Sequence, residues 1–144
     1  MEKQISYDSF KRAMQRSQIA FHKGIKNNIP EEYLENLGTL YDCYCFIKVF
    51  LHKDIFITSG YRCPELNRAL GGAPGSKHCV CKAFDFGFLN VVKTSDFYKT
   101  YDKLRENFIK YELSIGYSRS EALTKFRNHF LIYPDRIFIH FQID

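Results

Sequence analysis

Apolar residues recur at helical spacing in three long stretches of the chain. This spacing predicts helices over residues 6–23, 30–51 and 96–111. Gly24 ends the first stretch, and the acidic residues after Pro30 suit the first turn of the second. The second stretch carries a substantial apolar face, so we expect it to back a sheet.

Shorter segments rich in β-branched and aromatic residues predict strands. They are residues 55–58, 83–88, 113–117, 130–133 and 137–143. In the segment 83–88, three phenylalanines alternate with other residues, so they share one face of the strand while Asp85 points to the opposite face. We therefore expect Asp85 to face a polar cleft rather than the apolar core.

Length and composition fit one ordinary domain, residues 1–144, with a sizeable core. The chain has 144 residues, of which 45% are hydrophobic and 17% aromatic. No run long and apolar enough for a membrane span occurs. The net charge of +5 favours an anionic partner, such as nucleic acid, a membrane surface or bacterial cell wall, although scattered charges serve solubility equally well. We expect no nucleic-acid binding, because no basic stripe or nucleic-acid motif is present.

The cysteines form an odd set: Cys43, Cys45, Cys63, Cys79 and Cys81. The opening residues lack the apolar core of a signal peptide, so we expect reduced thiols in a protein that is cytoplasmic as synthesised. The two C-x-C pairs suggest a thiolate metal site, but zinc-binding cysteines usually stand roughly two to four residues apart. Small buried side chains are the favoured interpretation.

A second candidate metal site begins on the loop before the strand predicted over residues 83–88. Ser76, His78 and Asp85 form the pattern S-x-H-x6-D, in which an imidazole and a carboxylate are close enough in sequence to share one metal ion. A third ligand has to come from a neighbouring strand, and His140 in the last strand is the obvious supplier. Two histidines and one carboxylate, with a fourth position left to water, are typical of a hydrolytic zinc site. Taken singly, either histidine is more often an ordinary loop or strand residue.

Arg62 stands in a tight turn shortly before this loop, followed by a predicted short helix over residues 64–70. Its fixed positive charge can bind a carbonyl oxygen that becomes anionic during hydrolysis. An arginine that merely pairs with a surface acid is equally compatible with this position.

Three separated motifs occur in the chain in a fixed order. They are SGYRCPELNRALGG at residues 59–72, S-x-H-x6-D at residues 76–85 and F-x-H at residues 138–140. In these motifs, and over about residues 5–90 and 130–143, the chain resembles the zinc D-Ala-D-Ala carboxypeptidase and endolysin family. The resemblance implies an α+β fold, shared with the Hedgehog signalling domain, in which helices pack on one side of a small antiparallel sheet.

The resemblance also implies the chemistry of the site. It assigns one zinc ion per chain to His78, Asp85 and His140, transition-state stabilisation to Arg62, and substrate binding to Ser76. The expected reaction is hydrolysis of D-amino-acid-containing peptide bonds of peptidoglycan, by a carboxypeptidase or an endopeptidase. We expect a monomer that acts on the cell wall if it is released or exported; small single-domain members of the family without signal peptides are often phage-encoded.

Two positions depart from the family pattern. Cys81 replaces a usual glycine, and Ile137 stands where some members carry a catalytic carboxylate three residues before the last histidine. The general base is therefore unassigned. Asp135 is the nearest acid before the last histidine and is our candidate, with His129 and Glu112 in reserve. The missing carboxylate also permits a second function, that of a catalytically weak or inactive zinc-containing module that binds cell wall.

Overall fold

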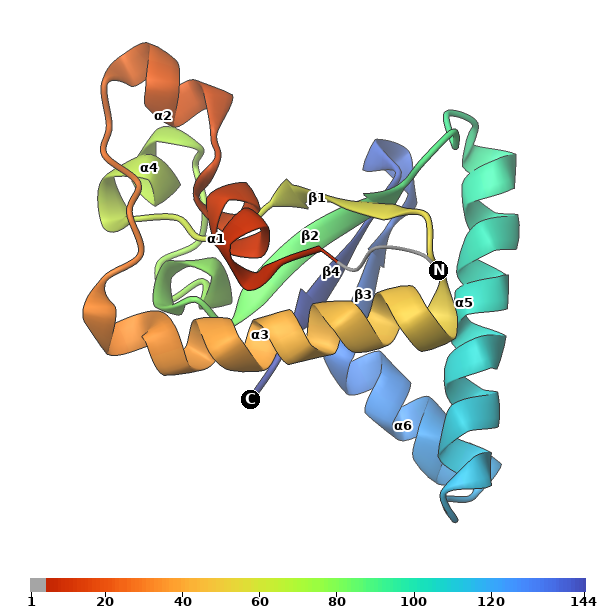
Figure 1. Ribbon diagram of the computed structural model, residues 1–144. Coiled ribbons are helices and arrows are strands. Elements are labelled where there is room, and N and C mark those ends of the chain that lie inside the picture. Colours follow the sequence, from red (N-terminus) through yellow and green to blue (C-terminus); the bar gives the residue numbers. More distant parts are fainter. Residues whose placement is uncertain (1–4) are drawn as a thin grey trace.

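Four short strands form one antiparallel sheet in the order β1-β2-β4-β3. They are β1 (Ile55–Ser59), β2 (Ala83–Phe88), β3 (Phe130–Tyr133) and β4 (Phe138–Gln142). The computed structural model describes residues 5–144, in which several helices surround this sheet (Figure 1). The predicted α+β fold with a small antiparallel sheet is confirmed.

The first predicted helix is interrupted. Two helices, α1 (Tyr7–Gln15) and α2 (Gln18–Lys23), replace the single helix expected over residues 6–23. Between them, Arg16 has extended backbone with φ −72° and ψ 130°. The Ser17 side chain accepts a hydrogen bond from the Ala20 backbone N–H and so caps α2. A serine that caps a new helix competes with continuation of the old one, which explains the break.

The second predicted helix is confirmed as a nearly continuous run of three elements. They are the 3₁₀ turn η1 (Glu31–Tyr33), α3 (Leu34–Phe46) and the π-helical η2 (Ile47–Leu51). The buried side chains of α3 are Leu37, Leu40 and Tyr44. Figure 1 shows α3 crossing in front of the sheet, with α1 beside it. This helix backs the sheet, as its apolar face predicts.

Most of the chain between β2 and β3 is helical. It forms α5 (Thr94–Ser114) and α6 (Arg119–His129). The strand predicted over residues 113–117 is wrong, because α5 continues to Ser114 and Gly116 then turns the chain at φ 106°. Ser118 and Glu121 form a reciprocal capping box that begins α6. The remaining short elements are α4 (Pro64–Ala69), η3 (Lys77–Val80) and η4 (Pro134–Arg136).

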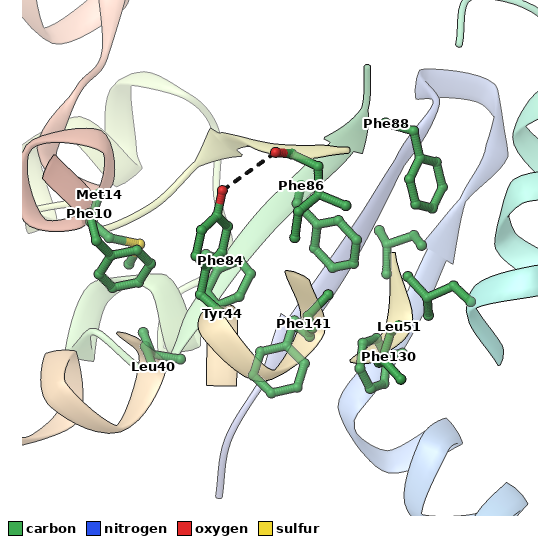
Figure 2. Close-up of a cluster of buried hydrophobic side chains, with 14 of the residues drawn as sticks. Phe10, Met14, Leu40, Tyr44, Leu51, Phe84, Phe86, Phe88, Phe130 and Phe141 are labelled. Atoms are coloured by element: carbon green, nitrogen blue, oxygen red, sulfur yellow. Dashed lines mark hydrogen bonds between the residues drawn. The ribbon is translucent and has the colours of Figure 1, made fainter. Parts of the chain in front are cut away.

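Aromatic side chains fill the space between the sheet and the helices (Figure 2). Phe84 and Phe86 from β2 are fully buried, and the ring of Phe84 lies 5.2 Å from that of Phe141 on β4. Burying a phenylalanine side chain stabilises a fold by about 1.5–3 kcal/mol. Because strand side chains alternate, the residues between these phenylalanines point to the other face of the sheet. That face carries Asp85 and His140.

Candidate metal centre

The register of β2 and β4 brings Asp85 and His140 together. Asp85 is the Cα partner of His140 in this antiparallel pair, so both side chains lie on the same face of the sheet. His140 Nδ1 lies 2.8 Å from Asp85 Oδ1, and His140 Nε2 lies 3.1 Å from Gln142 Oε1. The imidazole is thus held between two side-chain oxygens.

His78 reaches the same carboxylate from η3. The Ser76 side chain accepts a hydrogen bond from the His78 backbone N–H at 3.3 Å and begins this 3₁₀ turn, while Cys81 ends it in the left-handed conformation at φ 56°. The His78 side chain is buried, with Nδ1 2.7 Å from the Gly60 carbonyl oxygen and Nε2 3.3 Å from Asp85 Oδ1. The glycine that the family pattern has at position 81 would adopt this turn without strain, and Cys81 adopts the same conformation.

The protonation of His78 indicates a cation at this point. The Gly60 carbonyl oxygen only accepts hydrogen bonds, so Nδ1 must carry the proton that it donates. In the neutral tautomer, the lone pair of Nε2 then faces the ionised oxygen of Asp85. The conflict disappears if a metal ion lies between the imidazole nitrogens and the carboxylate, or if the histidine is doubly protonated. His140 fits the same scheme, because its Nε2 can donate to Gln142 and leave Nδ1 for the metal.

The three side chains fit a zinc ion in number and kind. One potential ligand atom from each of His78, Asp85 and His140 lies within 4.8 Å of the others. Burial raises the pKa of Asp85, but the neighbouring imidazoles of His140 and His78 lower it by a larger amount, so the net pKa lies below its usual value. The carboxylate is therefore ionised at neutral pH, as a metal ligand has to be. Two imidazoles and one carboxylate leave a coordination position open in a tetrahedral zinc site.

Arg62 lies beside this group. Its Nη2 is 3.9 Å from Asp85 Oδ2 and 3.3 Å from Ser59 Oγ, and its Nη1 is 3.5 Å from Asn67 Oδ1. The acid that it approaches is buried, so the alternative of an arginine paired with a surface acid does not describe this contact. Among the buried side-chain atoms of residues 5–144, Arg62 Nε has no hydrogen-bond partner. The unpartnered Nε is buried, so the Nη atoms are the donors that face the metal site.

The candidates for the general base lie elsewhere in the structure. Asp135 is exposed in η4, at the end of the β3–β4 hairpin and two residues beyond the last strand pair. Glu112 is buried on α5, where its carboxylate accepts a hydrogen bond from Lys125 at 3.0 Å. His129 ends α6, with Nδ1 2.8 Å from the Gln142 carbonyl oxygen. None of these three side chains belongs to the metal-binding group found within residues 5–144.

Two residues that orient the histidines were not singled out from the sequence. Gln142 lies two residues after His140 on a strand, and the period of two places both on one face, so this contact had a sequence signal. Gly60 acts through its backbone carbonyl, which no sequence pattern indicates.

The cysteines stay apart from the metal-binding group. All five thiols are free, and the metal-binding group found in residues 5–144 contains none of them. Burial raises the pKa of Cys43 to about 11 and that of Cys81 to about 12. Thiolates are the metal-binding form of cysteine, so neither side chain is in that form at neutral pH. Cys81 is a small buried residue, and Cys43 is partly buried.

A buried carboxylate shared by two oriented imidazoles is a group that could hold a metal ion, and such donor sets are typical of metal-dependent hydrolases. The sequence model of the peptidase M15 family matches residues 8–140, and the chain belongs to this family of metallopeptidases. No curated protein and no solved structure matches the chain. Within residues 5–144, no helix is both long enough and apolar enough to cross a membrane.

Proposed function

We propose that this protein is a zinc-dependent peptidase that hydrolyses D-amino-acid-containing peptide bonds of peptidoglycan. The observation that carries the proposal is the position of Asp85 Oδ1, which lies 2.8 Å from one imidazole nitrogen and 3.3 Å from another. His78, Asp85 and His140 would hold the metal ion. When bound, a zinc ion supplies Lewis acidity that activates water and polarises the scissile carbonyl group.

The residues around the ligands have separable tasks. The Gly60 carbonyl and the Gln142 side chain fix the ring orientation of the two histidines, which keeps the ligand nitrogens aimed at the metal position. Arg62 stabilises the oxyanion that develops on the scissile carbonyl, because its guanidinium lies beside Asp85 at the site. Ser76 begins the turn that carries His78, and its hydroxyl is our proposed contact for the substrate peptide.

Proton transfer needs a titratable group of this chain near the reacting atoms. Asp135 remains our proposal for this group. Since it lies at the exposed end of the β3–β4 hairpin, the role requires that this end bends toward the sheet face when substrate binds. Loss of a proton-transfer group typically lowers the rate about 10²–10⁴-fold.

Metal analysis combined with a digest of purified peptidoglycan tests the proposal. We expect one zinc per chain and release of amino acids or peptide fragments that a chelator abolishes. His140→Ala should lose both the metal and the activity. His22→Ala is a matched control, because His22 is exposed on α2 and outside the metal-binding group. Release that continues in the chelator, or full zinc content in His140→Ala, would refute the assignment.

One observation favours a second function, that of a zinc-containing module that binds cell wall without turnover. Ile137, which replaces the carboxylate of some relatives, ends η4 in the left-handed conformation at φ 58°. The same digest separates the two functions. A catalytically inactive module would contain zinc and sediment with peptidoglycan, yet release nothing.

A further inference from the structure

The break between α1 and α2 gives one arginine an unusual position. Arg16 leaves the helix in extended conformation, is exposed, and forms no ion pair with an acid among residues 5–144. The apolar pattern predicts continuous helix here, and the chain departs from it. Positions where the observed structure differs from the local sequence preference are often found at functional sites.

Buried contacts fix the backbone around Arg16 to the backbone around Arg62. The Asn27 side chain donates hydrogen bonds to the carbonyl oxygens of Gln15 at 3.1 Å and Tyr61 at 2.8 Å. Its own carbonyl oxygen accepts a hydrogen bond from the Cys63 N–H at 2.8 Å. Asn27 therefore bridges the residue before Arg16 to both neighbours of Arg62, and it is itself buried. The relative placement of the two arginines is built into the fold.

Both arginines line one cavity of about 460 Å³. Apolar side chains form much of the remaining wall, among them Ile19 from α2, Ile57 from β1 and Leu70 after α4. The cavity also includes Ser59 and Gly60, which contact Arg62 and His78 respectively at the metal site. It is thus a partly apolar recess lined by two arginines, and it adjoins the proposed reaction centre through Arg62, which lies 3.9 Å from Asp85.

From this arrangement we infer that the cavity is a substrate subsite in which Arg16 binds the C-terminal carboxylate of the peptide. The inference rests on the proposed function. Of the two peptidase types that this function allows, carboxypeptidase and endopeptidase, it favours a carboxypeptidase. A terminal D-alanine presents a methyl group and a carboxylate, which match the apolar wall and the free guanidinium. An internal residue of a cross-link would place a neutral amide there. Arginine recognises carboxylates through paired, charge-assisted hydrogen bonds.

The test compares two peptides with the zinc-loaded chain. One is a diacylated lysyl-D-alanyl-D-alanine, and the other is the same peptide ending in a carboxamide. For Arg16→Gln, we expect kcat/KM on the acid to fall about 10- to 100-fold, mainly through KM, with little change on the amide. Arg16→Lys should recover part of the loss. The matched control is Arg12→Gln, because Arg12 is exposed one turn earlier on α1, where it donates to Ser9.

A binding experiment separates this inference from the proposed function. Calorimetry with the non-hydrolysable reduced-amide analogue of D-alanyl-D-alanine, as acid and as carboxamide, should show acid-selective binding that Arg16→Gln removes. If such binding is found without hydrolysis, the subsite stands and the proposed peptidase activity falls. If peptides are cleaved but Arg16→Gln affects acid and amide alike, or neither, the inference is wrong and the peptidase stands. Absence of both hydrolysis and binding overturns both.

Discussion

Gly60 lies in close contact with the backbone of α1, and its carbonyl oxygen orients His78. A substitution at Gly60 therefore tests whether this contact positions the metal ligand. In Gly60→Ala, the added Cβ would lie 2.5 Å from Met14 Cα and 2.8 Å from Met14 C, and closest of all to the Met14 carbonyl oxygen. All three are backbone atoms, so no side-chain rotation relieves the clash. The same Met14 oxygen accepts a 2.7 Å hydrogen bond from the Tyr61 N–H. The β1 end and α1 would have to move apart.

The expected cost follows from these contacts. Overpacking a tight site typically costs about 1–3 kcal/mol, and losing the neighbouring hydrogen bond about 0.5–1.5 kcal/mol. We expect the free energy of unfolding to fall by about 2–4 kcal/mol in urea titrations. Because the Gly60 carbonyl orients His78, zinc affinity should also fall, by about 10- to 100-fold in a competition titration with a chromogenic chelator.

Gly38→Ala is the matched control. Gly38 lies inside α3 with no atom within 4 Å of an added Cβ, so alanine should stabilise the helix by about 0.5–1 kcal/mol and leave zinc affinity unchanged. If Gly60→Ala unfolds at the wild-type urea concentration and binds zinc with wild-type affinity, the close approach of β1 to α1 does not position His78, and this reasoning fails.

Three further predictions concern single side chains. Arg62→Ala should retain zinc and fold while kcat falls about 10²–10³-fold, with incomplete rescue by lysine in steady-state assays; an unchanged rate would show that Arg62 has no catalytic role. Asp135→Asn should retain zinc and lose about 10²-fold or more in hydrolysis, and full activity would eliminate Asp135 as the proton-transfer group. Since the pKa values of Cys43 and Cys81 are raised to about 11 and about 12, only about one thiol in 10³ or fewer is ionised at pH 8. Mass spectrometry should find both residues alkylated by iodoacetamide far more slowly in the native than in the urea-unfolded chain, with the native rate rising toward pH 11. Rapid native alkylation at pH 8 would contradict the raised pKa values.

Much of the sheet and of the metal-binding group follows from period-two patterns. The alternation around Asp85 places it opposite the phenylalanines, and the same period on the last strand places His140 opposite Phe141. Antiparallel pairing then makes the two side chains neighbours once the register is known. The alternation along each strand shows which residues share a face. The residues of the metal-binding group could therefore be predicted from the sequence, whereas the distances between them could not.

The break at Arg16 and the helix α6 were not predictable in the same way. Ser17 caps α2 in a segment whose apolar period alone favours one helix, and the hydrogen bonds from Asn27 that stabilise the break come from residues distant in sequence. In α6, only Ala122 and Phe126 are buried, so its apolar stripe is too narrow to detect. Tertiary contacts stabilise the break at Arg16, whereas the capping box of Ser118 and Glu121 was a local signal for the start of α6 that the apolar pattern alone does not contain.

Cys81 and Ile137 both depart from the family pattern, but the first concerns backbone conformation and the second the loss of a carboxylate, so their consequences differ. Cys81 changes a residue but not a conformation, since it adopts the left-handed backbone that glycine would take, at a cost of about 1–2 kcal/mol. The turn that carries His78 is therefore preserved, and so is the ligand geometry. Ile137 also adopts the left-handed backbone, but it removes a carboxylate that backbone geometry does not replace. Metal binding in this protein should thus be insensitive to the first departure, while turnover depends on whether another group, such as Asp135, moves the proton.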